Sequence, residues 1–138
     1  MLKFAEIIDF FYTGKKRLGH IFISLLKPLY VKIFIFIGIL TNAANWYFAY
    51  LINSNITSDR TILHYNVDFG INLIGAEKQL YIIPLIGLLI FLINFLILPI
   101  YYNQKEIKFM SYFLYTTSIL TNIFLLLAEV SIYLINLT

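Results

Sequence analysis

The sequence predicts an all-α integral membrane protein with three transmembrane helices and an N-terminal amphipathic helix at the membrane interface. Three observations predict this class. The chain of 138 residues is 61% hydrophobic and only 12% charged, whereas a soluble domain has roughly 25% charged residues. A chain this short cannot bury such an apolar excess in a core of its own. Three apolar runs also reach the length of roughly 20 residues that a helix needs to cross a bilayer.

The first segment, residues 1–28, is expected to lie on the cytoplasmic membrane surface. Its stretch LKFAEIIDFFY has a charged residue at every third position among apolar ones, which is typical of a short amphipathic helix. The basic cluster Lys15, Lys16 and Arg17 follows it. Such a cluster favours anionic lipid headgroups. Two alternatives stay open: the cluster only sets topology, or the helix docks a partner protein.

The three apolar runs are expected to be helices, because they are continuous and a closed barrel needs more strands than this chain can supply. The first run is longer than the core of a signal peptide, so we expect it to be retained. Pro84 suits the first turn of the second helix, and Pro99 is expected to bend or end it. The single membrane domain 1–138 then divides into spans 30–53, 80–102 and 109–136, an outer loop 54–79 and an inner loop 103–108.

Lysine and arginine residues predict the orientation, because they concentrate on the cytoplasmic side of membrane proteins. Eight of the ten lie before or at the mouth of the first span or between the second and third spans, and the remaining two, Arg60 and Lys78, lie between the first and second. The predicted topology has the N-terminus inside and the C-terminus outside. The expected location is the cytoplasmic (inner) membrane of a bacterium.

Small and polar residues recur on one face of each predicted span, which is typical of helices that pack closely in membranes. The members are Gly38, Asn42, Asn45 and Ala49 in the first span, Gly87 and Asn94 in the second, and Ser111, Tyr115, Ser118, Asn122, Glu129 and Asn136 in the third. We expect Asn42, Asn94 and Asn122 to face a shared interior and to bond one another or nearby backbone, since an unpaired amide in hydrocarbon is costly. The alternative is a polar conduction path, which requires oligomerisation.

Glu129 is the ionisable residue that lies well within a span. An acid inside a membrane indicates a functional site by default. The predicted depth, about 12 Å from the midplane toward the outside, favours pairing with a residue of the outer loop over proton transfer. The loop residues Arg60, His64 and Lys78 are the candidate partners.

The outer loop contains the stretch HYNVDFGINLIG at residues 64–75. We expect an extended or turned segment packed over the outer ends of the helices, leading into a short amphipathic turn. Its candidate functional or packing residues are His64, Tyr65, Asn66, Asp68, Gly70 and Gly75. A catalytic site at His64 and Asp68 is a minor alternative, because no known nucleophile or metal-binding pattern is present. We therefore predict no catalytic residue, no cofactor and no metal.

The same stretch, with YIIPLIG after it, resembles a group of small multi-span bacterial membrane proteins with an HYNVxFG-type outer loop. The resemblance covers about residues 62–100. The similar proteins usually have an acid at the position of Asn72, so the departure here counts against a cation site that needs that acid. The group has no assigned activity, and the resemblance adds weight to the loop without implying a reaction.

These observations favour a non-enzymatic subunit or assembly factor of a membrane complex in the cell envelope. The predicted partners are the lipid bilayer and other membrane proteins or further copies of this chain, and not nucleic acid, since the net charge of +3 is mild. The alternative is a small oligomeric transporter or channel whose path is lined by Asn42, Asn94, Asn122 and Glu129.

Overall fold

The computed structural model describes the backbone of residues 4–55, 61–66, 70–75 and 77–137, and the side chains within 13–55 and 78–136. In chain order, its elements are α1 (Phe4–Leu26), α2 (Leu29–Asn55), β1 (Thr61–Asn66), β2 (Gly70–Gly75), η1 (Glu77–Tyr81), α3 (Ile82–Ile97), η2 (Leu98–Tyr101) and α4 (Ile107–Leu137). The two η elements are short 3-10 helices.

Three helical segments are long and apolar enough to cross a membrane, namely Leu29–Asn55, Lys78–Tyr101 and Ile107–Asn136. The predicted fold class is thereby confirmed: a helical membrane protein with three candidate spans after an N-terminal helix. Large apolar side chains remain exposed around these spans, among them Phe36 at 67% and Phe124 at 68%. Exposed apolar surface of this extent is expected where lipid is the solvent.

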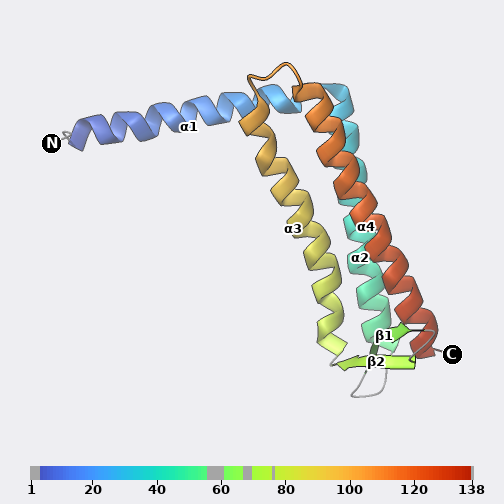
Figure 1. Cartoon of the computed structure of the whole chain (residues 1–138). Helices are drawn as coiled ribbons and strands as arrows, with labels where there is room; N and C mark the ends of the chain where they lie inside the picture. The colour runs from blue at the N-terminus through green and yellow to red at the C-terminus, as the bar shows by residue number, and fades with distance from the viewer. Residues whose placement is uncertain (1–3, 56–60, 67–69, 76, 138) are drawn as a thin grey trace.

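The first helix, α1, is longer than the sequence indicated. The predicted short helix and the basic cluster after it form one continuous helix that ends at Leu26. Gly14 and Gly19 lie inside it and do not break it, although each lowers helix stability by about 1 kcal/mol relative to alanine. Pro28 ends the helix, because the residue before a proline avoids helical geometry. Figure 1 shows α1 leaving the other helices sideways at one end of the bundle.

The helices α2, α3 and α4 form the bundle, and α4 packs against both of the others. Side chains at the end near α1 form one apolar cluster, whose buried members are Leu25, Val31, Phe91, Leu98 and Tyr115. A smaller cluster at the opposite end contains Ile52, Leu80 and Ile132. Between the two clusters the interior of the bundle is largely polar.

The two prolines of the second span act as the sequence predicts. Pro84 lies in the first turn of α3 and is buried. Pro99 follows the end of α3 within the 3-10 helix η2. The change to the tighter 3-10 geometry ends the second span, and α4 begins at Ile107 after a short connection.

The segment between the first two candidate spans, predicted as the outer loop, forms an antiparallel hairpin at the far end of the bundle from α1 (Figure 1). Thr61 pairs with Gly75 and Asn66 pairs with Gly70, with register irregularities around His64. The strand β1 lies against α4. This arrangement agrees with the predicted extended segment over the helix ends, and the turn after it is the 3-10 helix η1.

Candidate functional site

Three asparagines from two helices meet in the middle of the bundle, and we call Asn42, Asn45 and Asn122 the asparagine cluster. The side-chain amides of Asn42 and Asn45 each donate a hydrogen bond to the Oδ1 atom of Asn122, both at 3.0 Å. Asn122 is 0% exposed. A single acceptor oxygen on α4 therefore joins two turns of α2, which fixes the register of the two helices.

The asparagine cluster also bonds the backbone of α3. Asn42 donates to the carbonyl oxygen of Pro84 at 3.0 Å, and Asn122 donates to that of Gly87 at 3.3 Å. The cluster thus connects all three spans. A hydrogen bond between membrane helices contributes modestly on its own, about 0.6 kcal/mol on average, but a buried amide that loses its partners is costly.

Gly87 allows this approach of α3. A Cβ atom built there would overlap Oδ1 of Asn122 and would lie 3.1 Å from Nδ2 of Asn42. Gly38 has the same role on α2, about one helical turn before Asn42, since a Cβ atom there would overlap the ring of Phe91. These two glycines, which the sequence placed on packing faces, therefore allow the close contact between helices.

Asn94 lies apart from the asparagine cluster and bonds α4 alone, and a bond to nearby backbone was one of the two expected arrangements. It is half-buried and donates to Oγ of Ser118 at 2.8 Å and to the carbonyl oxygen of Leu114 at 3.3 Å. Both acceptors belong to α4, so Asn94 joins α3 to α4 only. Ser118 lies one turn before Asn122 on the same face of α4, so Asn94 meets α4 about one helical turn away from the asparagine cluster along the helix.

Glu129 lies two turns beyond Asn122 on α4 and is also 0% exposed. Neither of its carboxyl oxygens has a hydrogen-bond partner among the described residues. Lys78, one of the predicted partners, is exposed. The side chains of the other two, Arg60 and His64, lie outside the described part of the chain, so the expected pairing with them stays a prediction.

The outer-loop candidates lie on the hairpin. His64, Tyr65 and Asn66 belong to β1, and Gly70 and Gly75 are the first and last residues of β2. Asp68 lies outside the described residues, so the minor prediction of a His64 and Asp68 site is not tested. Among the described residues, no group of three or more His, Cys, Asp or Glu side chains is placed to hold a metal ion.

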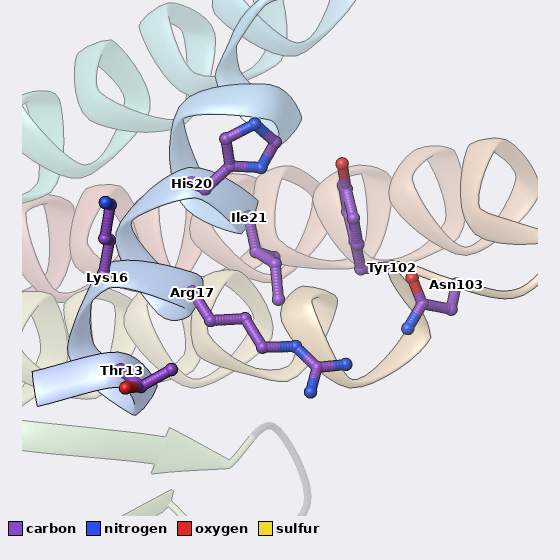
Figure 2. A pocket seen from close by; sticks show the side chains of 7 residues that line it. All are labelled: Thr13, Lys16, Arg17, His20, Ile21, Tyr102 and Asn103. Carbon is purple, nitrogen blue, oxygen red and sulfur yellow. The ribbon is translucent and has the colours of Figure 1, made fainter. Parts of the chain in front are cut away.

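A second polar feature lies at the opposite end of the bundle, where α1 meets the connection after η2. The hollow there, which we call the notch, encloses about 430 Å³ and is lined by Thr13, Lys16, Arg17, His20, Ile21, Tyr102 and Asn103. Figure 2 shows Arg17 reaching from α1 along Ile21 toward Tyr102 and Asn103. The basic cluster in the sequence indicated Lys16 and Arg17 as headgroup contacts. Tyr102 and Asn103 were not predicted, because only their position beside the end of a span distinguishes them in the sequence.

No known protein family, curated protein sequence or solved structure matches this chain. The geometry described above is therefore the basis for a functional proposal.

Proposed function

We propose that this small membrane protein is a non-enzymatic subunit or assembly factor of a membrane complex in the cell envelope. The observation that carries the proposal is that the buried asparagine amides form their hydrogen bonds within one chain. Those of Asn42, Asn45 and Asn122 bond one another and adjacent backbone within one chain. They hold a closed bundle together, and the faces left for other molecules are the apolar outer surface, α1 and the hairpin.

The experiment is mild detergent extraction of the full chain from native membranes, followed by mass determination of the intact particle and identification of its components. A reproducible set of other proteins is the expected result. Particles with this chain alone, as a monomer or a homo-oligomer, contradict the proposal. Gly87→Leu, which forces α3 from the asparagine cluster, should lose the partners, and Gly19→Ala, at a position with open space around it, should retain them.

The proposed orientation has the N-terminus and α1 in the cytoplasm and the hairpin outside. It rests on the eight lysines and arginines at one end against two at the other. A reporter fused after Thr138 should be active only in its exported form. Activity of a cytoplasmic reporter at that position would reverse the orientation.

The alternative function is a small oligomeric transporter or channel. The observation that favours it is Glu129, a buried carboxyl group without a hydrogen-bond partner among the described residues, since acids inside membranes often belong to ion or proton paths. Ion flux in liposomes that disappears in Glu129→Ala would support this function. Intact oligomers without flux would exclude the transporter or channel.

A further inference from the structure

We propose that the notch between α1 and the bundle is a binding site for the phosphate headgroup of an anionic glycerophospholipid. The proposal goes beyond a diffuse attraction of the basic cluster to the membrane, because it assigns one lipid to one site built from two parts of the chain. It does not depend on whether the chain is a subunit or a transporter.

The notch has a mostly apolar lining surface with exposed basic side chains around it, an arrangement that suits a phosphate group attached to a lipid. Lys16 and Arg17 carry permanent positive charges, and none of the seven lining residues is acidic. The guanidinium group of Arg17 presents its N–H donors in a planar fork that matches two phosphate oxygens. His20 adds a ring nitrogen to the same helix face, because residues 13, 16, 17, 20 and 21 recur at helical spacing.

The bundle side of the notch supplies neutral donors. Tyr102 has a hydroxyl group and Asn103 has a side-chain amide, and both can bond the alcohol part of a headgroup. Ile21 and the ring of Tyr102 are half-buried and pack on the apolar cluster near α1. They form an apolar floor against which the glycerol carbons of a lipid can lie.

The notch also lies at the depth of lipid headgroups. Tyr102 directly follows the last residue of the candidate span Lys78–Tyr101, and the next candidate span begins at Ile107. The α1 side is held there by its C-terminal part: the rings of Phe22 and Phe95 lie 5.5 Å apart, and Leu25 is buried in the bundle. A water-soluble anion could bind at any depth outside the membrane, whereas the headgroup of a lipid is held at this depth by its acyl chains.

The test is native mass spectrometry of the full chain, extracted in mild detergent and titrated with phosphatidylglycerol. We expect one lipid per chain to be retained, and phosphatidylcholine, which has the same phosphate without the net charge, not to be retained. Excess inorganic phosphate should not displace the bound lipid. Displacement by inorganic phosphate, or no retained phosphatidylglycerol, overturns the proposal.

Two variants of equal charge separate a site from diffuse attraction. The double variant Lys16→Gln with Arg17→Gln should bind the lipid about 30-fold more weakly, given the usual contribution of each basic residue near an anionic surface. The control Lys32→Gln with Lys108→Gln removes two exposed charges at the same end outside the notch and should leave binding within about twofold. Equal losses in the two variants mean that only net charge matters, which contradicts the site.

A third variant tests the contribution of the bundle. Tyr102→Phe with Asn103→Ala removes no charge, and it should weaken phosphatidylglycerol binding about fivefold through lost hydrogen bonds. Unchanged binding would show that α1 alone holds the lipid and would overturn the two-part site. The helix content of each variant, measured by circular dichroism, checks that the chain remains folded.

Discussion

Asn122 and Glu129 lie on the same face of α4 but differ in their hydrogen bonds. They lie on one face of the helix, two turns apart, and both are 0% exposed. The amide of Asn122 bonds Asn42, Asn45 and the backbone of Gly87 and Ser118. The carboxyl group of Glu129 bonds no described residue. We therefore expect Asn122 to stabilise the bundle and Glu129 not to, because only Asn122 has its partners in place among the described residues.

The largest expected effect comes from separating α3 from the asparagine cluster. Gly87→Ala places a methyl group against the Asn122 side chain and should lower the free energy of unfolding by about 3 kcal/mol through overpacking and lost hydrogen bonds. The single tryptophan, Trp46, stacks on Tyr81 at 5.9 Å, so its fluorescence during a titration with denaturing detergent reports unfolding.

Gly19→Ala is the matched control for this change. Open space surrounds Gly19 in α1, so the added methyl group should raise helix stability by about 1 kcal/mol. A loss of similar size in the two variants would mean that glycine flexibility, and not close approach at Gly87, explains the effect.

Removal of the Asn122 amide should have the next largest effect. Asn122→Leu keeps the number and branching of the side-chain heavy atoms but removes the acceptor that Asn42 and Asn45 share, so that each amide keeps only its backbone acceptor. Unsatisfied buried donors of this kind should lower the free energy of unfolding by about 2 kcal/mol. An unchanged detergent midpoint would show that the amides find other partners, and the asparagine cluster would then not hold the bundle.

Glu129→Leu should act in the opposite direction. Since no described group bonds the carboxyl oxygens, the substitution leaves no described partner unsatisfied and removes a buried polar group. We expect the unfolding free energy to rise by about 1 kcal/mol. A clear loss of stability would show that Glu129 has a partner among the residues that the structure does not describe.

The smallest expected effect is at Asn94. This side chain is half-buried and joins α3 to α4 only, so Asn94→Leu should lower the unfolding free energy by about 0.6 kcal/mol, the average for a bond between membrane helices. A loss as large as that of Asn122→Leu would place Asn94 in the same cooperative unit as the asparagine cluster.

Much of the bundle was predictable, because helical spacing decides which side chains share a face. The interval of seven placed Tyr115, Asn122, Glu129 and Asn136 on one packed face, and the first three are buried while Asn136 is half-buried. Spacing does not decide which partner a buried group meets. Asn94 bonds Ser118 because of where it lies along α4. Gly87 matters because its own carbonyl accepts a bond from Asn122 and because a Cβ atom there would overlap the Asn122 side chain.

The notch was only half predictable for a related reason. Lys16 and Arg17 stand out as charges in an apolar sequence, whereas Tyr102 and Asn103 are common residues in a short connection. They meet α1 because the chain turns sharply at Pro28 and again after Pro99. A local sequence pattern can predict each turn, but it cannot predict that the two turns bring residues far apart in the sequence together.

Whether the asparagine cluster, and not Glu129, holds the bundle together is tested most directly by two double-mutant cycles that measure the free energy of unfolding. Leucine substitutions at Asn42 and Asn122 should show a coupling of about 1 kcal/mol, because the two amides share a hydrogen bond. Leucine substitutions at Asn122 and Glu129 should be additive, since the two residues share no partner among the described residues. Additive effects for Asn42 and Asn122, or strong coupling between Asn122 and Glu129, would contradict the account.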